Sequence, residues 1–138
     1  MEQVDIRSFS FHDFTISDIE YSGDILGLHI SNNSCGALQR DLMLEMQVDE
    51  YDMSIYWIKQ YPRFHKVRLK GREISLSTLK SFFKKGYTIE IVEFMMSTDS
   101  PLVILDCVLF PYSPKPGVYN KIVLEIHYAP DHLVLKEK

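Results

Sequence analysis

Apolar and polar residues alternate along most of the chain, and this period-two pattern is typical of half-buried β-strands. Residues 25–30 follow it closely, and the turn-forming residues 22–24 before them predict a hairpin with the segment 14–21. Within that segment the apolar phase slips between Ile16 and Ile19. Because one extra residue shifts the side-chain phase of a strand, we predict a β-bulge between these two residues.

Further strands are predicted along the rest of the chain, at residues 42–48, 53–57, 65–72, 87–96, 102–110, 118–128 and 132–135. The segments 42–48 and 53–57 are out of phase, which fits two strands or one strongly bent strand. The segments 87–96 and 102–110 are apolar on both faces. Strands covered on both sides lie centrally, so we expect this pair in the middle of the sheet.

The segment 65–72 carries Val67 and Leu69 at one parity and Lys or Arg at the other. This alternation predicts a strand with one buried face and one basic face. One helix is also predicted, because three apolar residues recur at intervals of three and four from Leu79 onward. We expect Ser77 or Thr78 as its N-cap, and Gly86 as its left-handed C-terminal cap.

The composition fits one ordinary globular domain over residues 1–138. Of the 138 residues, 46% are apolar and 25% charged, and a chain of this length can bury a core without disulfides or metal. We therefore predict a mainly β, single-domain antiparallel sandwich or open barrel of about eight strands with one short amphipathic helix. An α+β fold is the alternative.

Cysteine usage and hydropathy indicate a cytoplasmic location. Cys35 and Cys107 have neither redox-pair nor metal-ligand spacing, so we expect two idle thiols, with Cys107 in the core. The chain begins with acidic residues rather than a basic, apolar leader, and no run approaches the roughly 18 apolar residues of a membrane span. We expect no secretory signal and no membrane partner.

The charge is strongly segregated along the chain, although its net value is only −4. Residues 1–56 hold eleven acidic and two basic residues, net −9, whereas residues 57–85 hold nine basic and one acidic, net +8. The remainder, residues 86–138, has a net charge of −3. Two surfaces follow as candidates: an acidic one suited to a basic partner protein, and a basic one with interleaved aromatic residues.

The basic residues have two interpretations. Aromatic side chains among cations on an extended segment can bind RNA or single-stranded DNA weakly, here through Lys59–Arg72. The preferred interpretation is that the basic strand pairs with acidic neighbours in its own sheet, because opposite charges across strands are mildly stabilising and the chain as a whole is negative. Nucleic acid is therefore the less favoured partner.

Four residues or pairs carry candidate chemistry. His12-Asp13 can ligate a metal, but the helical frame of a metal phosphohydrolase is missing, so we expect the pair to hold the strand entry. His29 and His127 occupy polar positions and could converge with Asp13 if their strands are neighbours. Asp106 stands in an apolar strand, and we expect a Tyr or Lys across the sheet to satisfy it.

The motifs of common enzymes are missing. The chain has no dinucleotide-binding glycine motif, phosphate-binding loop, nucleophile elbow or His-Glu-x-x-His zinc motif, so we expect no enzyme and no cofactor. One alternative is a small-ligand or metal-binding protein, or a hydrolase, with a pocket around Asp13, His29, His127 or Asp106. The other is the weak RNA or single-stranded DNA binder described above.

The motif Phe11-His12-Asp13 is followed by Ile16, Ile19, a turn at Gly23 and the strand Leu26-Gly27-Leu28-His29-Ile30. In these residues the sequence resembles a group of small bacterial proteins in which a Phe or Leu-His-Asp motif opens the first hairpin. Some members are classed as immunity proteins of polymorphic toxin systems. The resemblance covers about the first thirty residues, and it implies a cytosolic protein that neutralises a cognate toxin without doing chemistry. His12 and Asp13 are the residues it carries over.

The favoured function is a non-catalytic cytosolic protein that binds another protein through segregated charged surfaces, and that protein could be a cognate toxin. The pattern says nothing of the oligomeric state. The candidate binding residues are His12, Asp13, Asp41, Glu45, Asp49, Glu50, Asp52, Lys59, Arg63, Lys66, Arg68, Lys70 and Arg72.

Overall fold

A computed structural model describes residues 3–6, 9–12, 14–32 and 40–138. In chain order the elements are β1 (Gln3–Val4), β2 (Phe14–Ser22), β3 (Ile25–Asn32), β4 (Asp41–Gln47), the short 3₁₀ helix η1 (Glu50–Asp52), β5 (Met53–Arg63), β6 (Lys66–Ile74), α1 (Leu76–Lys84), β7 (Thr88–Met96), β8 (Leu102–Phe110), β9 (Tyr119–His127) and β10 (Leu133–Glu137). The predicted mainly β fold with one short α-helix is confirmed.

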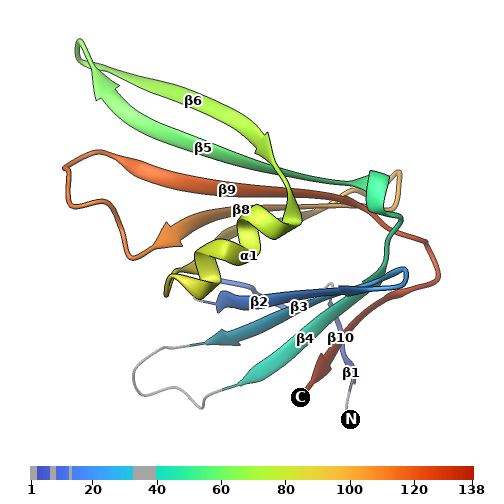
Figure 1. The fold of residues 1–138 in the computed structure, drawn as a ribbon. Helices are drawn as coiled ribbons and strands as arrows, with labels where there is room; N and C mark the ends of the chain where they lie inside the picture. The colour runs from blue at the N-terminus through green and yellow to red at the C-terminus, as the bar shows by residue number, and fades with distance from the viewer. Residues whose placement is uncertain (1–2, 7–8, 13, 33–39) are drawn as a thin grey trace.

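All these strands belong to one open antiparallel sheet with the order β1-β10-β4-β3-β2-β7-β8-β9-β5-β6. The sheet has two halves, and the seam between β2 and β7 is short: among the described residues, Thr15 pairs with Glu90 and Ile16 with Ile89 across it. Figure 1 shows the two halves as an upper and a lower layer. The predicted central pair is confirmed, because β7 and β8 lie in the middle of the strand order.

The core lies between the two layers, on the face that α1 also covers. It is built from alternate residues of nearly every strand together with two residues of α1, Leu79 and Phe82. Phe82 lies edge-on to Trp57 of β5 at 5.4 Å between ring centroids, and α1 also contacts β2. The helix therefore touches both halves of the sheet (Figure 1).

Local predictions agree closely with the structure in the first hairpin. β2 and β3 are joined at Gly23, whose φ of +63° is a left-handed conformation that glycine adopts without strain. The register of β2 shifts between Ile16 and Asp18, so the predicted bulge is present. Cys107 is fully buried, as expected, and burial raises the pKa of its thiol, whereas Cys35 lies outside the described residues.

The helix begins earlier than the sequence pattern predicts. Its N-cap is Ser75, whose Oγ accepts a hydrogen bond from the backbone N–H of Thr78 at 3.2 Å, so the predictions of Ser77 or Thr78 are wrong. The C-terminal end is as predicted: Gly86 has a φ of +92°, its N–H donates to Phe83, and Tyr87 N–H donates to Phe82. These two bonds form a Schellman motif.

Candidate binding surface

The hairpin of β5 and β6, residues 53–74, forms one end of the sheet, and we call it the basic hairpin. β6 pairs with β5 alone, and β5 also pairs with β9. Figure 1 shows the tip of the hairpin projecting beyond the other strands. Every residue of β6 except the last, Ile74, is exposed. The predicted buried face of this segment is therefore wrong: Val67 is 68% and Leu69 65% exposed.

The strand register places all six cations of the hairpin on one face. Lys59 lies opposite Lys70 and Arg63 opposite Lys66, and residues directly opposite in an antiparallel pair share a face. Two more cations share this face: Arg68 lies opposite Tyr61, and Arg72 lies opposite Trp57. We call this set the basic face: Lys59, Arg63, Lys66, Arg68, Lys70 and Arg72.

The predicted pairing of these cations with acidic neighbours is wrong. Within the described ranges, no carboxylate lies within ion-pair distance of any residue of the basic face. The reason is the strand order: β6 has β5 as its only neighbour, and β9 brings Asn120 rather than an acid opposite Lys59. Like charges opposite each other, as at Lys59 and Lys70, are mildly destabilising and keep the surface positive.

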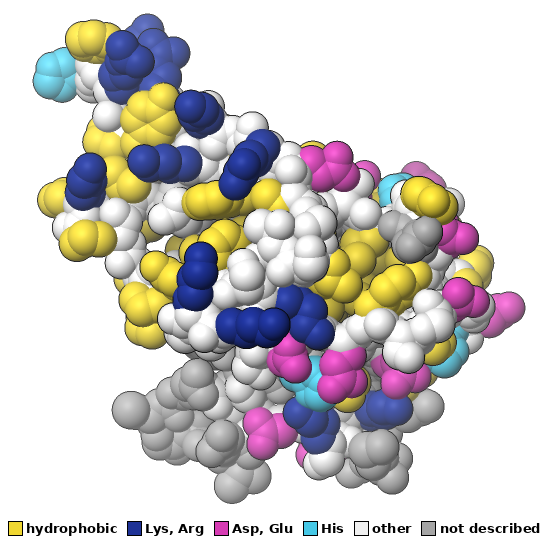
Figure 2. All heavy atoms as spheres, in the orientation of Figure 1, with side chains coloured by type: hydrophobic (Ala, Val, Ile, Leu, Met, Phe, Trp, Pro, Cys, Tyr) yellow, Lys and Arg dark blue, Asp and Glu magenta, His cyan; other side chains and the backbone are white. Residues whose placement is uncertain are grey.

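The aromatic residues of the basic face are partly covered. The guanidinium of Arg72 lies 5.1 Å from the ring centroid of Trp57, and Phe82 contacts the same ring. Trp57 Nε1–H donates to the side-chain oxygen of Asn120 at 3.2 Å. A shallow hollow of about 380 Å³ lies beside this tryptophan and is lined by Trp57, Lys59, Lys70, Gly71 and Arg72. Figure 2 shows the Lys and Arg side chains gathered on this end of the molecule, among apolar ones.

The turn of the hairpin is strained. Phe64 and His65 connect the two strands with φ values of +52° and +61°, and two successive positive φ angles in a two-residue loop define a type I′ turn. Asn and Gly are the residues that usually adopt this turn, because other side chains crowd the backbone there. Phe64 is 77% exposed at the tip, and the Arg63 guanidinium lies 5.2 Å from its ring centroid.

Replacing the turn by its favoured residues, Phe64→Asn with His65→Gly, should stabilise the hairpin by about 1 kcal/mol, because the left-handed conformation costs a non-glycine residue about that much. We expect slower amide hydrogen exchange at the strand ends, at Tyr61 and Arg68, in the variant. Exchange that stays the same or becomes faster would show that the native turn is not strained.

Asp106 is paired with a lysine across the sheet, as the sequence predicts. Lys121 of β9 places its Nζ 3.2 Å from Oδ1 and 3.3 Å from Oδ2 of Asp106, on the outer face of β8. The carboxylate is therefore paired, and the contact is structural. Val108 is the direct register partner of Lys121, so the ammonium reaches Asp106 diagonally.

His29 and His127 do not converge, because β3 and β9 are separated by β2, β7 and β8 in the strand order. His29 lies with Asp18 and Glu20, each offering one ligand atom within 4.8 Å of the others, which is a geometry that could hold a metal ion. Its Nε2 lies 3.1 Å from Glu20, and its Nδ1 lies 2.6 Å from Lys138 Nζ. An ammonium can only donate a hydrogen bond, so Nδ1 is the acceptor in the contact with Lys138, and Nε2 is the ring nitrogen that faces Glu20.

His127 and His12 lie in different surroundings. His127 is half-exposed, 3.4 Å from Glu125. His12 is exposed before β2 and lines a hollow with Glu90 and Tyr112, while Asp13 lies outside the described residues. Tyr112 donates a hydrogen bond to Glu90, which raises the pKa of the tyrosine hydroxyl. His127 also lines a hollow together with Asp24, Asp49 and Asp52.

The predicted acidic surface is divided. Asp41 lies at the start of β4, and Asp49 and Asp52 lie beyond its end, where Asp49 caps η1 by accepting from the Tyr51 N–H. Glu50 belongs to η1, and its side chain lies outside the described set. Glu45 is in the middle of the outer face of β4 and is already paired. Asp49 and Asp52 line one hollow together with Asp24, whereas Asp41 and the paired Glu45 lie on β4 itself.

Glu45 contacts one lysine and one histidine, Lys136 of neighbouring β10 and His132 of the turn before it. Lys136 Nζ lies 3.1 Å from one carboxylate oxygen and His132 Nε2 lies 3.0 Å from the other. The hydrogen bonds from Lys136 and then from His132 hold the pKa of the Glu45 carboxyl below its ordinary value. A lowered carboxyl pKa contributes stability above the unfolded-state pKa, and that contribution is lost as the pH falls through the folded-state pKa.

The variant Glu45→Gln should therefore lower the free energy of unfolding by about 0.5 kcal/mol at pH 7, the size expected of a surface ion pair. The difference from the wild type should shrink as the pH falls below the ordinary glutamate pKa, and vanish once the native carboxyl is protonated too. Urea unfolding across this pH range measures it. Asp41→Asn, at an exposed carboxyl on the same strand, is the control; an equal effect of both variants would contradict the assignment.

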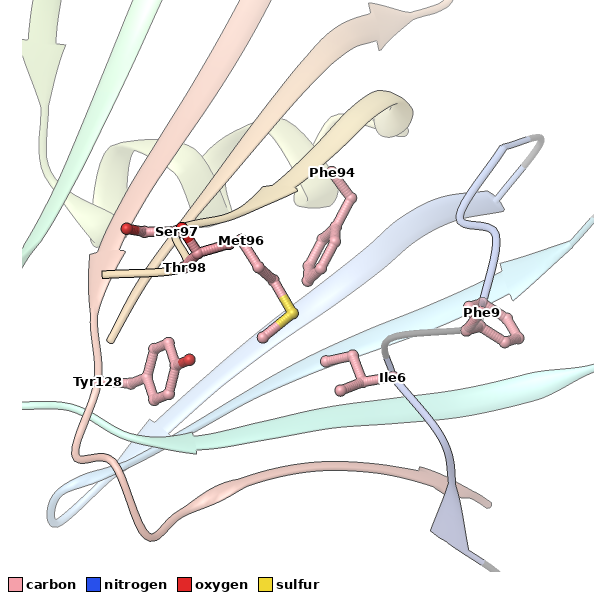
Figure 3. Close-up of a pocket in the computed structure, with 7 residues that line it drawn as sticks. All are labelled: Ile6, Phe9, Phe94, Met96, Ser97, Thr98 and Tyr128. Atoms are coloured by element: carbon pink, nitrogen blue, oxygen red, sulfur yellow. The ribbon is translucent and has the colours of Figure 1, made fainter. Parts of the chain in front are cut away.

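A second hollow, of about 420 Å³, lies away from the basic hairpin. Figure 3 shows Phe94 and Met96 of β7 facing Ile6 and Phe9 of the N-terminal segment, with Tyr128 at one side. Its polar groups in the described residues are hydroxyls, those of Ser97, Thr98 and Tyr128. The hollow can accept an apolar group, because most of its described lining side chains are apolar.

The sequence indicated the charges of the basic face but missed the hairpin that presents them. Four of the cations recur at every second residue from Lys66, which predicts one face. The reversal at Phe64-His65 carries no glycine, asparagine or aspartate, so the sequence contains no signal for the turn.

No helix among the described residues is long and apolar enough to pass through a membrane. Comparison with protein-family models, curated proteins and solved structures finds no match to this chain.

Proposed function

We propose that this protein is a non-catalytic binding protein whose basic face holds an acidic surface of a partner protein. The observation that carries the proposal is the set of six cations on one face of a projecting hairpin, with no carboxylate in ion-pair reach in the ranges the structure describes. Unpaired charges gathered on one face attract a surface of opposite charge and fix its orientation.

Nucleic acid is the second candidate partner, and the covered ring of Trp57 counts against it. Single-strand binding uses open aromatic faces on which bases stack. Here Arg72 and Phe82 both lie against the ring of Trp57. The chain as a whole is negative, at −4, which adds a repulsion that a polyanion of any length would meet.

The resemblance of the first thirty residues to immunity proteins extends this proposal. Neutralising a toxin requires a stable complex and no chemistry. A cytoplasmic location is part of the same proposal. Co-expression with the product of the adjacent gene tests this extension: a stable complex and relief of toxicity support it, and a non-binding, harmless neighbour refutes it.

The binding proposal is tested with a triple variant, Lys66→Gln, Arg68→Gln and Lys70→Gln. The matched control removes three exposed lysines outside the hairpin: Lys84→Gln, Lys85→Gln and Lys115→Gln. Both proteins lose the same charge. Poly-glutamate and an oligouridylate of equal charge serve as probes, titrated at several salt concentrations.

We expect wild type and control to bind poly-glutamate in a salt-dependent manner, and the hairpin variant to bind it about tenfold more weakly, a loss of about 1.4 kcal/mol. Equal binding by the two variants, or no binding by the wild type, would overturn the proposal. Tighter binding of the oligouridylate than of poly-glutamate would replace it with the nucleic-acid candidate.

A further inference from the structure

The outer edge of β6 is a long, open strand edge. β6 is nine residues long and ends the strand order, so no described strand pairs with its outer side. A strand in this position presents backbone N–H and C=O groups that can pair with another chain. Eight of its nine residues are exposed, and the hairpin tip projects from the body, so this edge is sterically accessible (Figure 1).

The two faces that flank this edge have different chemistry. On one face are four cations of the basic face, at alternate residues from Lys66 to Arg72. On the other face stand Val67 and Leu69, which are 68% and 65% exposed, followed by Gly71 and the exposed Glu73. Covering exposed valine and leucine side chains with another apolar surface removes them from water, which favours binding.

We propose that β6 accepts an extended segment of the partner as an added antiparallel or parallel strand, in which acidic and apolar residues alternate. This inference rests on the proposed function and names the recognition element. A strand added beside β6 places its alternate side chains on the same two faces. Its acidic residues meet the basic face, its apolar residues cover Val67 and Leu69, and its backbone pairs with the open edge.

Two other occupants, a nucleic acid and a second copy of this chain, do not satisfy all three features. A nucleic acid would contact the cations and leave Val67 and Leu69 in water. A second copy of this chain, paired β6 to β6, would bring Lys and Arg opposite Lys and Arg on the basic face. Like charges directly opposite are destabilising, and natural edges use lysines to prevent such self-pairing. The same charges that exclude a second copy therefore select an acidic strand.

The test uses two nine-residue peptides with five glutamates and four valines. In one the two residues alternate, and in the other the glutamates precede the valines as a block. We expect the alternating peptide to bind at least tenfold more tightly than the block peptide. Amide hydrogen exchange within residues 66–74 should become at least tenfold slower when the alternating peptide saturates the protein, and poly-glutamate should not produce this protection.

The variant Val67→Thr with Leu69→Thr removes the apolar face and keeps every charge and the strand propensity. It should lose about tenfold in affinity for the alternating peptide and bind poly-glutamate as the wild type does. If the two peptides bind equally, with unchanged exchange in β6, strand addition is refuted while the proposed charge-mediated function stands. If neither the peptides nor poly-glutamate bind, the proposed function itself is refuted.

Discussion

Replacing Ile16 by alanine should lower the free energy of unfolding by about 3–4 kcal/mol, because it opens a cavity at the narrowest point of the sheet. Ile16 is fully buried, and it pairs with Ile89 in the two-residue seam that joins the halves. Few backbone bonds hold the halves together there, so side-chain packing supplies much of the cohesion. Ile16 belongs to the buried core that both layers build, so we expect the site to have little freedom to collapse around the missing atoms.

Urea unfolding followed by circular dichroism measures this loss. Val67→Ala is the control, because that side chain is 68% exposed and its truncation should cost less than about 0.5 kcal/mol. Ile89→Ala should cost about as much as Ile16→Ala, and the double variant should cost less than the sum, since the two residues share one cavity. A loss below about 1 kcal/mol for Ile16→Ala would show that the seam is held by other contacts.

The elements that the sequence predicts well are those set by neighbouring residues. The β2–β3 hairpin follows from turn residues and alternating strands, and its bulge follows from a slip in the apolar phase. The end of α1 follows from a glycine placed after the last apolar turn. Each of these features depends on a few consecutive residues, so a single sequence contains the information.

The basic hairpin shows what local patterns leave out. Alternation in β6 correctly separates the cations from Val67 and Leu69, but it does not say whether the apolar side is covered. Coverage depends on the strand order, and β6 lies at the end of the sheet with both faces in water. The prediction of a buried face assumed that apolar residues in a strand find a core, which fails for a strand that projects from the body.

The sequence predicted which residues of the candidate site are charged, but not that they lack acidic partners. The clustering of Lys and Arg between Lys59 and Arg72 is a fact of the sequence, whereas their lack of acidic partners follows from which strands are adjacent. The same dependence explains the histidines. His29 and His127 could have met only if β3 and β9 were neighbours, and three strands lie between them.

The second large effect is expected at the helix. Phe82→Ala should lower the free energy of unfolding by about 3 kcal/mol, because Phe82 is 9% exposed and fills the space between α1 and the sheet. Its ring contacts Trp57 at 5.4 Å and Tyr87 at 6.1 Å, both edge-on, so three aromatic side chains lose packing together. Phe82→Leu keeps most of the volume and should cost less than half as much.

Trp57 allows the effect of Phe82→Ala to be measured at the basic hairpin itself, in addition to the overall stability. It is the only tryptophan of the chain, so its fluorescence reports on the base of the basic hairpin. Removing the Phe82 ring exposes the indole to water, and the emission of the folded variant should shift to longer wavelength. Amides of β5 near Trp57 should exchange faster, and those of the β2–β3 hairpin should not. A stability loss without any change in Trp57 emission would mean that α1 does not anchor the hairpin, and that β9 alone holds β5 in place.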